Sequence, residues 1–192
     1  MKIHQVLVIL LLAASRLPAN QPPVPAEPVI VVCMDRAIDP WVIERAQVTA
    51  SRMFAGIGVF LEWRSTHNCG QGPNIIIELR SSTPRDYRPG SLAEAFPYEK
   101  THIRMFYDRI QSSAEPAFLS RLLAHVLVHE ITHMLEGVIR HSDTGVMKAH
   151  WDGKDYTAMD SKPLPFAAED IQIIHAGILH RYGLDEAAVA TH

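Results

Sequence analysis

The residue types best suited to chemistry are His129, Glu130 and His133, which stand in the sequence His-Glu-Ile-Thr-His. Residues four apart share one face of a helix, so both imidazoles can bind the same zinc ion. Glu130 would lie beside them, where a carboxylate can act as general base toward a zinc-activated water. The spacing therefore predicts a zinc site that hydrolyses amide bonds. His125 falls on the same helical stripe, and we expect it to pack or to support a ligand rather than to bind the metal.

A catalytic zinc ion takes three protein ligands and leaves its fourth position to water. His141 is the predicted third ligand, because Gly137 allows the chain to leave the helix and turn back toward the metal. Three other residues are alternative candidates for the third ligand. Asp143 and His150 lie in the same segment, and Glu169 would serve in a scheme with a downstream carboxylate.

The hydrophobic pattern indicates the strands that must support this site. Runs of β-branched and other apolar residues predict strands at residues 29–33, 59–63, 74–79 and 102–107. A helix is expected between the first two strands. Because a strand, helix, strand order crosses over with a right-handed turn, the sheet is expected to be largely parallel.

Three helices are expected from apolar spacing and from end signals. The first begins with Asp39 as the N-cap and Pro40 in the first turn, and it ends at glycines 56 and 58. The second carries the zinc motif, from a capping box of Ser112 and Glu115 to about residue 136. A loop rich in glycine and aspartate follows, and the last helix covers residues 165–182.

The N-terminal region is typical of an exported protein. Lys2 precedes an apolar run over residues 6–14, which is too short to span a bilayer as a mature helix. We therefore expect a signal peptide at residues 1–19, a proline-rich leader at 20–28 and one catalytic domain at 29–192, in a secreted or periplasmic protein. A membrane anchor or a buried first strand is the alternative for the apolar run.

The two cysteines, Cys33 and Cys69, are consistent with export. An even number of cysteines in an oxidising compartment favours a disulfide, which would stabilise the fold by about 3–4 kcal/mol. Two buried free thiols are the alternative. The net charge of -3 and the pI near 6.4 give no basis for nucleic-acid binding.

The segment from His129 to Met147 resembles the extended zinc motif and the following Met-turn of the metzincin clan of zinc metallopeptidases. The resemblance implies that Met147 lies beneath the metal as a hydrophobic floor. The motif is longer by two residues than the usual pattern, and in this it is similar to a metzincin-like group of short exported bacterial proteins. The last helix and residues 92–97 resemble the closing helix and the antiparallel edge strand of matrix-metalloproteinase-type domains.

The resemblance implies an α+β fold, an α/β sandwich. Its twisted, mostly parallel five-stranded sheet would have an antiparallel edge strand, a backing helix, an active-site helix and a C-terminal helix. An extended substrate would add to the edge strand, with contacts from Leu92, Ala93, Glu94 and Tyr156. Val126, Trp151 and Tyr156 are candidates for the side-chain pocket, and packing in the core is the alternative for each.

We therefore expect a secreted zinc-dependent endopeptidase that acts on peptide or protein substrates. We expect a monomer that binds no nucleic acid and, after signal cleavage, no membrane. A catalytically silent, zinc-stabilised binding module and a zinc amidase that acts on cell-wall peptides are the alternatives. An intact Glu130 favours an enzyme, because a structural zinc site needs no base.

Overall fold

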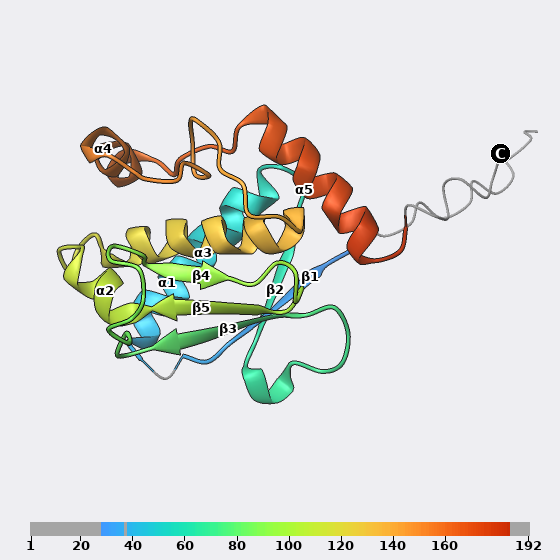
Figure 1. The fold of residues 1–192 in the computed structure, drawn as a ribbon, viewed down its shortest axis with the longest axis horizontal. Helices are drawn as coiled ribbons and strands as arrows, with labels where there is room; N and C mark the ends of the chain where they lie inside the picture. The colour runs from blue at the N-terminus through green and yellow to red at the C-terminus, as the bar shows by residue number, and fades with distance from the viewer. Residues whose placement is uncertain (1–27, 37, 185–192) are drawn as a thin grey trace, which may run out of the picture.

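The computed structural model describes residues 28–36 and 38–184 (Figure 1), so the expected signal peptide and most of the leader lie outside the described residues. The strands are β1 (Ile30–Met34), β2 (Leu61–Arg64), β3 (Ile75–Arg80), β4 (Ala93–Ala95) and β5 (His102–Phe106). The helices are α1 (Pro40–Ala55), α2 (Tyr107–Ser112), α3 (Leu119–Glu136), α4 (Gly153–Ser161) and α5 (Ala168–Arg181), with a short 3-10 helix η1 at Thr66–Asn68. Within the described ranges, no helix is both long and apolar enough to cross a membrane.

The five strands form one sheet in the order β2-β1-β3-β5-β4. Every neighbouring pair is parallel except β4 and β5, which pair antiparallel with Ala93 opposite Met105 and Ala95 opposite Ile103. This arrangement confirms the expected fold class, including the antiparallel strand at the edge. β1 is almost completely buried, as its continuous apolar sequence predicts for a strand of a parallel sheet.

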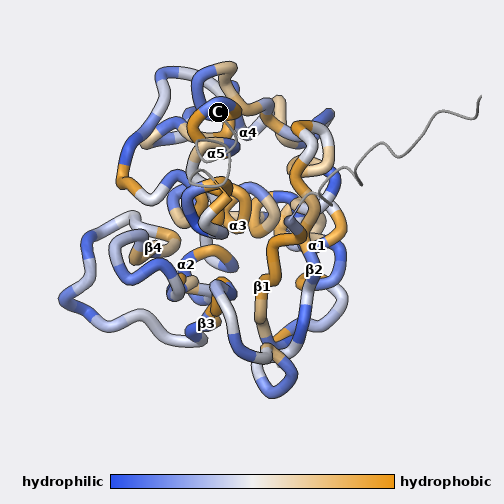
Figure 2. Tube along the Cα trace, turned by 90° about the vertical axis from the view of Figure 1, so that its right-hand side faces the viewer, coloured by the Kyte–Doolittle hydropathy of each residue, from blue (hydrophilic) through white to orange (hydrophobic). Residues whose placement is uncertain are grey.

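The helices form two further layers. α1 and α3 pack against each other over the sheet, while α4 and α5 lie on the far side of α3 (Figure 1). Figure 2 shows the hydrophobic residues concentrated along β1 and α3, and nearly all of α3 is buried. At the crossing of α5 on α3, a Cβ at Gly177 would lie 1.9 Å from the carbonyl oxygen of Leu135. Only glycine therefore permits this close approach of the two helices.

The start of α1 differs from the prediction at one residue. Pro40 is the first helical residue, as expected, but Asp39 makes no side-chain cap and has a left-handed backbone with φ of 43°. Its carboxylate instead accepts a hydrogen bond of 2.8 Å from the hydroxyl of Tyr107. The side chain therefore joins α1 to α2 rather than capping its own helix.

The predicted capping box of Ser112 and Glu115 is wrong. The chain forms a separate short helix, α2, directly after β5, and α3 begins only at Leu119. The carbonyl of Glu115 accepts hydrogen bonds from the N–H groups of Phe118 and Leu119. This turn separates the two helices, so Pro116 lies in the connection and not in the first turn of α3.

The segment between Met147 and the last helix contains α4, whereas the sequence predicts only a loop there. Asp152 and Asp155 form a reciprocal capping box at its start. An aspartate takes the place of the glutamate or glutamine that usually marks this motif, so the signal was missed. The last helix begins at Ala168, three residues later than predicted.

A disulfide joins Cys33 to Cys69, with the two Cα atoms 5.6 Å apart. It links the end of β1 to the segment that follows η1. Hydrogen bonds support the same region, because the side chain of Asn74 donates to the carbonyl of Cys69 and Asp35 accepts from the N–H of Thr66. The turn-rich segment between β2 and β3 is therefore fixed to the sheet.

Candidate metal centre

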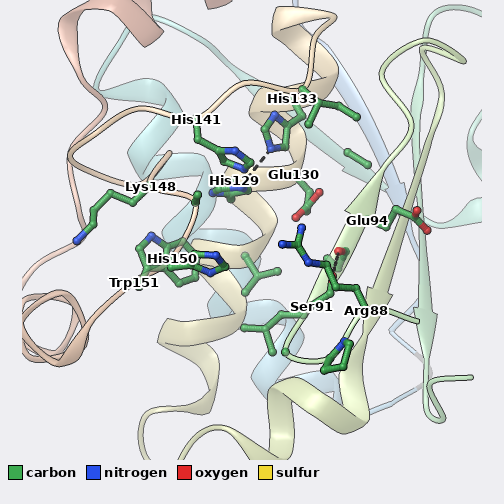
Figure 3. A pocket seen from close by; sticks show the side chains of 18 of the residues that line it. Arg88, Ser91, Glu94, His129, Glu130, His133, His141, Lys148, His150 and Trp151 are labelled. Carbon is green, nitrogen blue, oxygen red and sulfur yellow. Dashed lines mark hydrogen bonds between the residues drawn. The ribbon is translucent and has the colours of Figure 1, made fainter. Parts of the chain in front are cut away.

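Three imidazoles converge at the C-terminal half of α3. The helix contributes His129 and His133, and the following loop contributes His141 (Figure 3). Each histidine offers one nitrogen atom to a group in which all three lie within 4.8 Å of one another. The Nε2 atoms of His129 and His133 are 3.2 Å apart. Two nitrogen ligands of a tetrahedral zinc ion stand about 3.3 Å apart, given Zn–N bonds of about 2.0–2.1 Å.

The protonation of these histidines suits metal binding. Nδ1 of His129 lies 2.9 Å from the carbonyl oxygen of Val146, which assigns the proton to Nδ1 and leaves a lone pair on Nε2. Burial lowers the pKa of His129 to about 4 and, with the neighbouring histidines, that of His133 to about 3. Burial also lowers the pKa of His141. All three are therefore neutral at pH 7, which is the form that binds a metal.

The donor set fits zinc in a catalytic site. Three neutral imidazole nitrogens leave the fourth tetrahedral position to water or substrate, whereas a structural site is closed by four protein ligands. No other histidine, cysteine or carboxylate of the described residues joins this group. The site also opens into a cleft, described below, so a substrate can approach the remaining position.

The loop that carries His141 leaves α3 at Gly137. This glycine ends the helix with a left-handed backbone, φ of 71°, and its N–H donates to the carbonyl of His133. The prediction that Gly137 turns the chain out of the helix is thus confirmed.

The neighbours of His141 on both sides are held by one buried carboxylate on α5. Nη1 of Arg140 donates to Oδ1 of Asp170 at 2.7 Å, and the hydroxyl of Ser142 donates to the same oxygen at 2.5 Å. Asp170 is fully buried, so water competes little for these bonds. The loop of residues 137–147, called the zinc loop below, is therefore fixed to α5 at two points that flank His141.

A second buried carboxylate, Glu136, lies in the same cluster. Its Oε1 accepts from Nη1 of Arg140 at 3.0 Å, while its Oε2 is buried and has no hydrogen-bond partner. Burial raises the pKa of Glu136 to about 7, although the charge of Arg140 opposes the shift. Glu136 and Asp170 together hold the guanidinium at the base of the loop.

The end of the loop contacts His129 through the carbonyl of Val146 and is fixed by backbone bonds. Gly145 has φ of 76°, and a Cβ there would lie 2.3 Å from the carbonyl oxygen of Pro165. The N–H of Val146 donates to that same carbonyl, and the carbonyl of Met147 accepts from the N–H of Ser142. Met147 is fully buried in the core. Its expected place beneath the metal stays a prediction.

Glu130 lies beside the histidines at the floor of the cleft (Figure 3). Burial raises the pKa of its carboxyl group to about 8, against a hydrogen bond from the backbone of Ala95, and the charge of Glu94 adds to the increase. A divalent cation on the histidines would favour the ionised carboxylate and so oppose this shift.

The cleft has a volume of about 550 Å³, within the usual range for a ligand site. α3 forms its floor, the segment from Arg88 to Ala95 forms one wall, and the loops around His141 and Trp151 form the other. The residues predicted to contact substrate line it: Leu92, Ala93, Glu94, Val126, Trp151 and Tyr156. The side chain of Glu94 nevertheless turns out of the cleft, toward Arg104 (Figure 3).

The edge strand β4 presents backbone groups to this cleft. Residues Leu92 and Phe96 bond to β5, through the carbonyl of one and the N–H of the other. Because antiparallel pairing alternates, the backbone groups of Ala93 and Ala95 point away from β5. The N–H of Ala95 donates to the carboxylate of Glu130, and the carbonyl of Ala93 accepts from the hydroxyl of Ser91 at 2.7 Å. The N–H of Ala93 and the carbonyl of Ala95 are therefore the groups that an added extended chain would pair with.

The alternative ligands lie elsewhere. The carboxylate of Glu169 is mostly exposed and pairs with Arg140 at 3.2 Å. Asp143 and His150 are exposed and outside the ligand group, although His150 lines the cleft. His125 packs as expected, because its Nδ1 contacts the carbonyl of Arg121 and its Nε2 accepts from the N–H of Leu164.

Sequence reasoning missed several residues around the site. Arg88 and Lys148 line the cleft, and Arg140 and Asp170 fix the zinc loop. None of them belongs to a recognised spacing. The sequence offered one signal, the position of Asp170 as an acidic residue in the first turn of a predicted helix. The structure shows that this side chain is completely buried.

The comparisons with known proteins bear on the fold. No protein-family model and no curated protein matches the chain. Among solved structures, the chain is similar to the crystal structure of archaemetzincin (amzA) from Methanopyrus kandleri, with a TM-score of 0.51 and 14% identity over 78% of this chain and 94% of that chain. The protein therefore shares an archaemetzincin-like fold. The finer resemblance to matrix-metalloproteinase-type domains stays a prediction.

Proposed function

We propose that this protein is a zinc-dependent endopeptidase. The observation that carries the proposal is the convergence of three neutral imidazoles, His129, His133 and His141, at the floor of an open cleft that also contains Glu130. The name of the structural neighbour, archaemetzincin, is consistent with this class. When bound, zinc would lower the pKa of a water molecule to about 7 and polarise the carbonyl of the scissile bond.

The residues of the chain supply the other steps. Glu130 would take the proton of the attacking water and pass it to the leaving amine. The outward N–H of Ala93 and carbonyl of Ala95 would bond to an extended peptide and hold its scissile bond over the histidines. An extended peptide or protein segment is therefore the expected substrate, bound by a monomer.

We also propose that the protein acts outside the cytoplasm. The disulfide between Cys33 and Cys69 supports this, because disulfides persist in oxidising compartments. The apolar run at residues 6–14 supports it independently through its likeness to a signal peptide.

Zinc content and peptide cleavage, measured together, test the proposed function. Glu130→Ala should retain one zinc per chain by elemental analysis and lose about 10²–10⁴-fold in cleavage of a mixed peptide library. Glu44→Ala, an exposed position on α1, is the matched control and should cleave at the wild-type rate. His133→Ala should lose both zinc and cleavage.

Each other outcome has a defined meaning. Unchanged cleavage in Glu130→Ala would remove Glu130 from the mechanism. Stoichiometric zinc without cleavage of any peptide in the library would favour the binding module over the enzyme. Cleavage of cell-wall peptides alone would identify the amidase.

A further inference from the structure

The cleft contains a permanent positive charge, Arg88, for which the described residues supply no ion pair. Arg88 belongs to the loop before β4 and lines the same cleft as Glu130 and Ala93. Figure 3 shows its guanidinium directed from the loop toward the middle of the cleft, below Glu130. Arg88 is exposed, but its side chain lies on the cleft side of the loop and so faces the proposed substrate.

The other fixed charges that line the cleft are compensated. The ammonium of Lys148 lies 2.5 Å from Asp155 and 3.2 Å from Asp152. The carboxylate of Glu94 lies 3.3 Å from the guanidinium of Arg104. Glu130 is buried and is assigned to the reaction itself. The cleft therefore presents one uncompensated fixed charge to a substrate, and it is positive.

The backbone that carries Arg88 is held in place by a second arginine. Nη1 of Arg109 donates to the carbonyl oxygens of Arg88 at 2.7 Å and Ser91 at 2.9 Å, and Nη2 donates to that of Tyr87 at 3.4 Å. The guanidinium of Arg109 also lies 5.3 Å from the ring centre of Phe106. A planar group with several donors is needed to bind three carbonyls at once. The loop is thus built to hold Arg88 at the wall of the cleft.

The direction of β4 determines which part of a substrate would meet Arg88. A substrate strand would pair antiparallel with β4, as β5 does on the other side of β4. Its C-terminal side would then lie toward the residues that precede β4. Arg88 precedes β4 by five residues. The residues that follow the scissile bond therefore lie on the side of Arg88.

We propose that Arg88 is a specificity residue that binds a carboxylate on the C-terminal side of the scissile bond. The proposal rests on the proposed peptidase function and adds its substrate class, acidic peptides. The guanidinium suits a carboxylate because two parallel N–H groups bind its two oxygens. The carboxylate is either an aspartate or glutamate side chain or the free C-terminus of a short peptide.

Binding to an inactive protein tests the subsite without relying on turnover. The zinc-loaded Glu130→Gln protein is titrated into fluorescent peptides that carry Glu or Gln on the C-terminal side, each as a free acid and as an amide, and anisotropy is measured. In this background Arg88→Gln and Arg88→Glu are compared with Arg85→Gln. Arg85 is exposed in the same loop and does not line the cleft, so it is the matched control.

We expect the Glu peptide to bind roughly 5- to 20-fold more tightly than the Gln peptide, as for one charge-assisted bidentate pair. Arg88→Gln should abolish the difference, Arg88→Glu should reverse it, and Arg85→Gln should preserve it. If the free acid and not the side chain produces the difference, the terminal carboxylate is the ligand.

The subsite is overturned if the difference survives in Arg88→Gln, if Arg85→Gln removes it equally, or if no peptide binds at millimolar concentration. Cleavage by the wild-type protein separates the two proposals. Selective binding without cleavage leaves the subsite and refutes the peptidase, whereas cleavage without an acidic preference leaves the peptidase and refutes the subsite.

Discussion

Replacing Asp170 with alanine removes the carboxylate that holds the zinc loop to α5. Asp170 is fully buried and accepts three bonds, from Arg140 at 2.7 Å, from Ser142 at 2.5 Å and from the N–H of Ala167 at 3.0 Å. Removing one partner of a buried ion pair costs about 3–5 kcal/mol. Arg140 is partly exposed and retains its ion pair with Glu136, so water and this second carboxylate compensate part of the loss. We therefore expect the free energy of unfolding to fall by about 2–4 kcal/mol.

The expected loss is measurable in two assays. For a chain of this size, about 2–4 kcal/mol lowers the Tm by roughly 4–16 °C in thermal unfolding. The loop that carries His141 also loses its support, and the loss of such outer contacts weakens metal binding about 10- to 100-fold. Competition with a chelating dye would measure the zinc affinity of the folded protein at a temperature well below its Tm.

Glu169→Ala is the matched control. Glu169 is the preceding residue and also pairs with Arg140, but 70% of its side chain is exposed. An exposed pair contributes about 0–1 kcal/mol, so both zinc affinity and Tm should stay near the wild-type values. Equal zinc affinity in the Asp170→Ala and Glu169→Ala proteins would refute the idea that the buried carboxylate positions His141.

Three further predictions concern the fold. Gly177→Ala should destabilise the protein by at least about 1–3 kcal/mol in urea unfolding, because its Cβ has no room against the backbone of α3. Replacing Cys33 and Cys69 with serine should cost about 3–4 kcal/mol and lower the Tm. Glu136→Gln should gain unfolding free energy relative to the wild-type protein as the pH rises from about 4.5 to 7. The raised pKa of Glu136, about 7, means that the folded state holds a proton that the unfolded state releases near its ordinary pKa of 4.5. The contribution of Glu136 to stability therefore decreases as the pH rises from 4.5 to 7, and the variant lacks this decrease.

Each of these has its own control. Gly153→Ala has open space for the added Cβ, and it should not destabilise the protein. A reducing agent should lower the Tm of the wild-type protein and leave the double serine variant unchanged. For Glu136, a difference in unfolding free energy between the wild-type and variant proteins that stays constant between pH 5 and 7 would contradict the assigned burial effect.

Much of the sheet could be predicted from the sequence because its strands are short apolar runs separated by turn residues. The observed bounds of β1, β2, β3 and β5 lie within two residues of the predicted ones. α4 could not be found in this way, since only one of its residues, Met159, is buried. A helix that contributes so little to the core leaves no apolar periodicity in the sequence.

The metal site likewise has a part that local sequence predicts and a part that depends on long-range contacts. The helical part of the cluster follows from local geometry, because His129 and His133 are one turn apart on any helix. The contacts of Asp170 with Arg140 join residues thirty positions apart. They depend on how α5 crosses α3, which no local pattern encodes. Arg88 likewise belongs to a loop that Arg109, on α2 and 21 residues further along the chain, bonds to through the backbone.

Because the loop that carries His141 is attached to α5, the metal site depends on an element that follows all three histidines in the sequence. A ribosome makes α5 last among the described elements. A growing chain that has reached only residue 160 already contains all three histidines, but it lacks the carboxylate that fixes the third. Full metal affinity would therefore require the C-terminal helix to be docked on α3. Docking of α5, rather than the presence of the three histidines alone, would thus set the onset of tight metal binding.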